Sequence, residues 1–188
     1  MIKKITLFIF FALFAAHVSG QKYEISISPG IFTTTDWGKY SKPSPGISAM
    51  ALFNYQVNTK WSVFSHYHYG RFYEQGTKEK LPIDTEYLSF GVARHFQINP
   101  STRVGIGTGI GLIYESTVAY EIRFDEASGN NQIEKGKRTI RDFSMPLLLT
   151  LKKDINERFF YGLTTGFYVT PFYIFGGYHL APTIGIKL

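Results

Sequence analysis

The chain has no cysteine, so it can form neither a disulfide nor a thiolate metal site, and we expect no lipid anchor on an N-terminal cysteine. After the first twenty residues, no segment of useful length has the apolar period of an amphipathic helix. The basic residues form no patch or helix-length stripe, so a formal charge of +6 does not indicate a nucleic-acid partner. What remains is a β-rich domain in which aromatic residues make up 17% of the chain.

The start of the chain has the three-part layout of a secretory signal peptide. Residues 1–4 are short and basic, residues 5–16 are apolar and uncharged, and small residues follow up to Gln21. The apolar run is shorter than the ~20 residues that a membrane-spanning helix needs. The sequence therefore predicts a signal peptide over residues 1–20 and one domain over residues 21–188.

One stretch carries most of the information about architecture. Glycines alternate there with larger residues: Gly105, Gly107, Gly109 and Gly111 lie between Val104, Ile106, Thr108, Ile110 and Leu112. In a strand this gives one apolar face and one face without side chains. A soluble sheet would leave bare backbone in water, whereas a membrane barrel would turn the apolar face to lipid and leave room in its lumen for large side chains.

Eight strands follow from the same reading, over residues 23–33, 46–57, 61–73, 84–97, 102–116, 140–153, 158–170 and 176–188. Each reaches the ~9–11 residues of a tilted transmembrane strand. Short turns rich in Asn, Asp and Pro alternate with connections that are mostly longer. This pattern predicts an all-β fold, an eight-stranded antiparallel up-and-down transmembrane β-barrel in the outer membrane.

Alternation also predicts which residues face lipid. In the sixth strand these are Phe143, Met145, Leu147, Leu149 and Leu151, and similar sets follow in the fourth, seventh and eighth strands. Arg94 interrupts an apolar face, but it lies near a short turn, where a basic residue costs only ~0–1 kcal/mol. Pro182 cannot donate to a ladder, so we expect a local bulge around it.

Aromatic residues are expected to form girdles at both ends of the strands. The set near the short turns is Tyr55, Trp61, Phe96, Phe159 and Tyr161; the set near the long connections is Tyr69, Tyr73, Tyr114, Tyr120, Phe172, Tyr173, Phe175 and Tyr178.

With a signal that ends before Gln21, Asn-rich turns and the closing pattern of residues 180–188, the chain resembles the small outer-membrane β-barrels of Bacteroidota, in particular the PorT-like branch. It is similar in plan to the barrels OmpX and OmpA. The resemblance implies insertion by the general barrel-assembly machinery, with the terminal strand as the recognition signal. Leu188 departs from the terminal aromatic residue of proteobacterial barrels. No catalytic residue is carried over.

The lumen offers two interpretations. His66 and His68 point inward from one strand and His179 could approach them, which would suffice for a zinc site with an open position. The alternative is a polar plug in which the histidines, Arg103, Glu115, Asp142 and Lys152 pair with one another, since eight strands enclose a lumen that side chains just fill. We assign no catalytic, cofactor-binding or metal residues.

Three other functions fit the sequence less well. A lipid A-modifying enzyme needs a serine beside a base, but Ser65 and His66 face opposite sides and Ser62 lies far from His66. A pore needs far more strands. A soluble lipocalin-like barrel needs an apolar lumen and a polar exterior, the reverse of the glycine pattern.

The strongest candidate for binding is the long loop over residues 117–139. It has many charges of both signs, from Glu121, Arg123, Asp125, Glu126, Glu134, Lys135, Lys137 and Arg138, with Arg141 beyond them, around the flexible residues 128–131. Such a loop on a rigid barrel can present binding residues, or extend as a hairpin that offers an edge, or be only a solvated tip. We expect a non-catalytic protein with a structural, adhesive or envelope-assembly role, in contact with outer-membrane lipid and with an envelope or surface protein.

Overall fold

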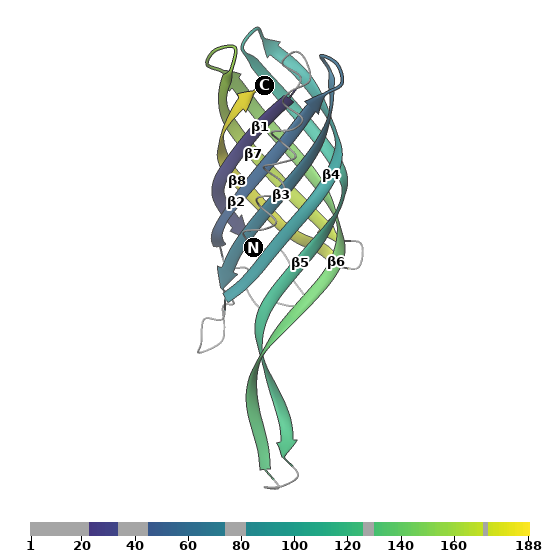
Figure 1. Cartoon of the computed structure of the whole chain (residues 1–188), viewed down its shortest axis with the longest axis vertical. Helices are drawn as coiled ribbons and strands as arrows, with labels where there is room; N and C mark the ends of the chain where they lie inside the picture. Colours follow the sequence, from purple (N-terminus) through teal and green to yellow (C-terminus); the bar gives the residue numbers. More distant parts are fainter. Residues whose placement is uncertain (1–22, 34–44, 74–81, 126–129, 171–172) are drawn as a thin grey trace.

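The computed structural model describes residues 23–33, 45–73, 82–125, 130–170 and 173–188. It contains β1 (Tyr23–Thr33), β2 (Pro45–Gln56), β3 (Trp61–Tyr73), β4 (Pro82–Asn99), β5 (Thr102–Asp125), β6 (Asn130–Asp154), β7 (Phe159–Thr170) and β8 (Tyr173–Lys187). Each strand pairs antiparallel with the next, and β8 pairs with β1 to close a barrel (Figure 1). The predicted closed eight-stranded antiparallel barrel is confirmed.

Residues 1–20, where we expect the signal peptide, lie outside the described residues. In the described part of the chain, no helix is long and apolar enough to cross a membrane.

The strands have the alternating faces that the sequence predicts. On β6, Phe143, Leu147 and Leu151 are exposed, whereas Ser144 and Lys152, each next to one of them in the strand, are buried. The same alternation runs along β4, β5, β7 and β8, with the predicted residues outward. The exterior is therefore apolar over much of its height, and the polar residues of these strands lie mainly inside.

The glycine-rich face makes room for a large side chain in the lumen. A Cβ atom on Gly91 would lie 2.6 Å from Cζ of Phe64, and one on Gly107 would lie 2.9 Å from Cε1 of the same ring. Phe64 is buried beside Ala93 and Leu148. The expectation that the alternating glycines leave space for side chains from other strands is confirmed at Gly105 and Gly107, whereas Cβ atoms on Gly109 and Gly111 would first meet backbone atoms of β4.

Asparagine side chains fix the short turns at one end of the barrel. Oδ1 of Asn58 accepts hydrogen bonds from the backbone N–H groups of Lys60 and Trp61, both at 2.9 Å. Oδ1 of Asn156 does the same for two N–H groups, both at 2.8 Å, and Asn99 accepts from Ser101 at 3.0 Å. We call this the turn end and the opposite end the hairpin end.

The ladder between β1 and β8 is interrupted at two opposed prolines. Tyr23 and Leu188 exchange two backbone hydrogen bonds, so the antiparallel alternation puts Pro29 and Pro182 at a hydrogen-bonding position. Neither proline has an N–H, and no pairs form between residues 28–30 and 181–183. The register is the same on both sides of this gap, so the expected bulge at Pro182 is wrong: the proline is accommodated by a second proline across from it.

Hydroxyl groups bridge the strands behind this gap. The side-chain oxygens of Ser28 and Thr183 lie 2.7 Å apart, and those of Thr183 and Thr164 lie 2.6 Å apart. Side chains therefore connect β1, β8 and β7 where the β1–β8 backbones do not.

Most of residues 117–139 do not form the predicted loop, and the alternative that they extend as a hairpin is confirmed. Pairing between β5 and β6 continues from Ser116 opposite Thr139 to Asp125 opposite Asn130, so these residues extend both strands as a ribbon (Figure 1). Because the strands extend, their backbone N–H and C=O groups bond to each other, whereas in a loop these groups would bond to water. Residues 126–129, which include part of the predicted flexible tip, lie outside the described residues.

Candidate functional site

The turn end of the lumen is held by a network of ion pairs. Lys152 donates to Oε2 of Glu24 at 2.8 Å, and Arg103 donates to Oε1 of the same carboxylate. Asp154 accepts from Lys187 at 2.6 Å and lies 3.8 Å from Arg103. Glu24 and Lys152 are almost fully buried, so each charge needs its partner.

The sequence predicted only part of this network. Arg103 and Lys152 were expected in a polar plug and do lie in one, but Glu115 and Asp142 lie towards the other end of β5 and β6. The acid that serves instead is Glu24, which had been missed. Its inward position could have been read from the sequence, because Tyr23, Ile25 and Ile27 alternate with it.

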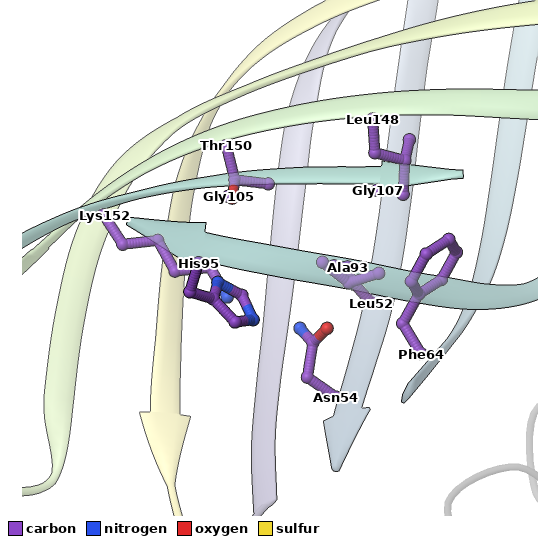
Figure 2. Close-up of a pocket in the computed structure, with 10 residues that line it drawn as sticks. All are labelled: Leu52, Asn54, Phe64, Ala93, His95, Gly105, Gly107, Leu148, Thr150 and Lys152. Carbon is purple, nitrogen blue, oxygen red and sulfur yellow. The ribbon is translucent and has the colours of Figure 1, made fainter. Parts of the chain in front are cut away.

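The middle of the lumen is an apolar layer of Met50, Leu52, Phe64, Ala93 and Leu148. Between this layer and the charges lies a cavity of about 10 Å³, which Figure 2 shows with its ten lining residues. Such a cavity has room for about one water molecule. The described lumen is therefore closed by side chains, as expected for eight strands.

Aromatic rings and histidines fill the lumen towards the hairpin end. Tyr87 and Tyr168 stack with their ring centroids 4.0 Å apart, and His68 stacks on Tyr168 at 5.0 Å. His179 lies edge to face against His68 at 4.8 Å, and His66 is 5.6 Å from Tyr168. The three histidines gather in one layer, but among the described residues no three His, Asp or Glu side chains are placed to hold a metal ion.

Three histidines bond to serines, in pairs that the sequence did not predict; the longest of these contacts, 3.4 Å, joins Ser89 to Nε2 of His66. Ser62 lies 2.8 Å from Nε2 of His95, and Ser48 lies 2.8 Å from Nδ1 of His179. Ser62 and His95 come from neighbouring strands, so only the register brings them together. A nucleophile and its base have this spacing. Ser62 is nevertheless 1% exposed, so an acyl chain cannot reach it.

The outer surface carries a wide apolar band. Its members are Ile27, Ile31, Val63, Leu88, Phe90, Val92, Ile106, Ile110, Leu112, Phe143, Met145, Leu147, Leu149, Leu151, Leu163, Phe167 and Ile184, each at least 36% exposed. In water, a contiguous apolar surface of this extent would be exceptional for a monomer.

Polar and aromatic residues lie at both margins of this band. At the turn end, the guanidinium of Arg94 lies 5.7 Å from the ring of Trp61 and 5.1 Å from that of Phe96, so its expected position is confirmed. At the hairpin end, Asp84 accepts hydrogen bonds of 2.6 Å from both Tyr69 and Arg71. The band thus ends at defined rows of residues on both sides.

The ribbon of β5 and β6 projects beyond the rest of the barrel (Figure 1). Pairing of β5 with β4 ends at Thr117, and pairing of β6 with β7 begins only at Met145. Within the described residues, the projecting strands therefore pair with each other and leave both outer edges open. At its base, the guanidinium of Arg141 lies 5.7 Å from the ring of Tyr114.

No protein-family model matches the sequence, and no curated protein is detectably similar to it. Solved structures do resemble the fold. Neisserial surface protein A is 10% identical, with 90% of this chain and 100% of that chain covered and a TM-score of 0.64. Ail, the attachment invasion locus protein of Yersinia pestis, is 14% identical over 88% of this chain and 95% of that chain, with a TM-score of 0.55.

A second structure of Ail, in complex with the heparin analogue sucrose octasulfate, gives 14% identity, 88% and 96% coverage, and a TM-score of 0.52. At these identities the likeness shows a shared fold. The class that the fold defines is the closed antiparallel eight-stranded barrel.

Proposed function

We propose that the chain is an integral outer-membrane barrel protein without catalytic activity, with a structural, adhesive or envelope-assembly role. The observation that carries this proposal is the apolar band around a side-chain-filled lumen. In a membrane the lipid covers this apolar band, whereas in water the band would stay exposed to solvent. The outer-membrane expectation agrees with the class of barrels that share the fold.

Other features support parts of this proposal. The rows with Trp61 and Arg94 at one margin and Tyr69 at the other fit membrane interfaces, where amphipathic rings are favoured. Leu188 pairs with Tyr23 at the closing seam, which fits recognition of the terminal strand by the barrel-assembly machinery. The PorT-like assignment remains a proposal that rests on the closing sequence pattern.

The structure lends no support to a lipid A-modifying enzyme or a lipocalin-like barrel. The Ser62–His95 pair is buried next to a cavity of about 10 Å³. A lipocalin-like lumen would be open to a ligand, whereas this one is packed with side chains.

The ribbon is the element that we assign to adhesion. Its open edges fit strand addition by an extended segment of a partner. Four basic residues, Lys135, Lys137, Arg138 and Arg141, also lie within seven positions of β6. Since Ail has been solved with a heparin analogue, a sulfated glycan is a ligand to test first.

Membrane location is tested by substituting Ile110→Arg. Ile110 is 72% exposed in the apolar band, and an arginine at the bilayer midplane costs ~2–4 kcal/mol. We expect less heat-modifiable protein in the outer-membrane fraction, with Val57→Arg at the turn end as the matched control. Unimpaired assembly of Ile110→Arg would refute the lipid-facing assignment.

Surface exposure of the ribbon can be tested separately because the chain has no cysteine of its own. We expect Thr139→Cys to react with a membrane-impermeant maleimide on intact cells, and Glu157→Cys, at an exposed position of the turn end, to react only after lysis. Binding of intact cells to immobilised heparin should fall when Arg138 and Arg141 are both replaced by glutamine. If the cysteine in the ribbon is labelled on intact cells but the cells do not bind heparin, the ribbon is surface-exposed and a sulfated glycan is not its ligand.

A further inference from the structure

The layer of three histidines contains more buried polar atoms than partners. His66, His68 and His179 are all fully buried. Four of their ring nitrogens have no hydrogen-bond partner: Nδ1 of His66, both nitrogens of His68, and Nε2 of His179. Buried polar atoms are nearly always paired, and a cluster of unpaired ones indicates a missing binding partner such as an ion or water.

His179 is held as a metal-ligating histidine usually is. Its Nδ1 lies 2.8 Å from the hydroxyl of Ser48, which leaves Nε2 as the free nitrogen. A hydrogen bond to one ring nitrogen fixes the orientation of the ring and presents the other nitrogen to a ligand. The ring that lies against it, at a centroid distance of 4.8 Å, is that of His68, both of whose nitrogens are free.

A thioether lies in the same layer. Met50 is the direct cross-strand partner of His68 in the β2–β3 ladder, a position at which Cβ atoms are typically ~4.5–5.5 Å apart. Its Sδ atom lies 3.9 Å from the hydroxyl of Tyr168, the ring that stacks on His68. Met50 is itself buried, so its sulfur faces the lumen.

The donor set selects the kind of ion. No three His, Asp or Glu side chains of the described residues can hold a metal, so a hard divalent ion lacks both a third imidazole and an anionic ligand. Two imidazoles, which suit several metals, and a soft thioether are instead all neutral, and the thioether favours Cu(I) among the biological metals. A single positive charge is also the least costly to bury among aromatic rings. We propose that Met50, His68 and His179 bind one Cu(I) ion inside the barrel.

This inference is independent of the role assigned to the ribbon, and copper retention tests it directly. The barrel is refolded in detergent with Cu(I) under oxygen-free, reducing conditions, and excess metal is removed with a chromophoric Cu(I) chelator. Heat-modifiable mobility identifies the folded fraction. We expect one retained copper per folded barrel, with nitrogen and sulfur neighbours in its X-ray absorption spectrum.

Variants separate this site from adventitious binding. Met50→Leu should remove the sulfur neighbour and most of the retained copper, and Ser48→Ala should weaken retention by about 10–100-fold through loss of the Ser48–His179 bond. His95→Gln is the control, since His95 is buried at the turn end beside Ser62. Absence of retained copper would overturn the proposal, as would equal retention by Met50→Leu or tighter binding of Zn²⁺ than of Cu(I).

Discussion

The two ends of the lumen are held by different forces. At the turn end, Glu24 forms directional bonds with both Lys152 and Arg103 from across the barrel, between a few buried charges. At the hairpin end, Phe32, Phe72, Tyr87 and Tyr168 pack with rings at several angles and distances. Loss of one charge leaves another unpaired, whereas loss of one ring leaves its neighbours in partial contact. The comparison teaches that the turn end is the less tolerant of substitution.

The largest effect is expected for Glu24→Ala. Removing one member of a buried ion pair typically costs ~3–5 kcal/mol, because the partner charge stays buried. Here Lys152 would lose the acid to which it donates, and Arg103 would keep only Asp154, 3.8 Å away. We expect urea unfolding in detergent or lipid to show this loss of free energy.

A double substitution tests the cause. Glu24→Gln with Lys152→Met replaces the Glu24–Lys152 pair by uncharged groups of similar size and leaves Arg103 with Asp154, 3.8 Å away, so it should recover part of the stability lost in Glu24→Ala. If the double variant is as unstable as the single one, the buried charge of Lys152 is not the cause of the loss.

A smaller effect is expected for Tyr168→Leu at the hairpin end. The substitution removes the stacking contacts with Tyr87 and His68, each worth ~0.5–1.5 kcal/mol beyond the area that it buries. We therefore expect a loss of about 1–3 kcal/mol in the same unfolding measurement. Tyr168→Phe is the matched control and should lose less, since it keeps the ring. A larger loss than that of Glu24→Ala would reverse the comparison.

The smallest effect is expected for Lys187→Met. Its bond to Asp154 belongs to the same network, but both side chains are partly open to solvent. Such pairs contribute ~0.2–1 kcal/mol. Stability measured in low and high salt should differ less for this variant than for the wild-type protein, and an effect as large as that of Glu24→Ala would mean that Asp154 is as critical as Glu24.

The sequence predicted the parts of the fold that depend on alternation. The strands and their faces follow from rows such as Phe143 to Leu151, because a period of two leaves only two choices of face. The short turns follow from Asn58, Asn99 and Asn156, whose side chains replace backbone partners.

Contacts between side chains on neighbouring strands were harder to predict, because they depend on the register of the strands. The Ser62–His95 bond and the proximity of Met50 to His68 arise only when neighbouring strands are aligned. The extension of β5 and β6 was only one of the alternatives for residues 117–139, because the charged residues there fit a loop as well as an exposed ribbon. A bulge was predicted from Pro182 by itself, whereas the way in which the ladder accommodates Pro182 depends on Pro29, which lies opposite it on β1.

The opposed prolines also give the cylinder a defined line of mechanical weakness. Where Pro29 faces Pro182, two backbone hydrogen bonds are missing, and the hydroxyls of Ser28 and Thr183 bridge the gap from inside. A force that pulls β1 away from β8 would therefore act on two separate sets of paired residues, one on each side of this gap, and not on one continuous ladder. Under such a force, we expect β1 and β8 to separate in two steps.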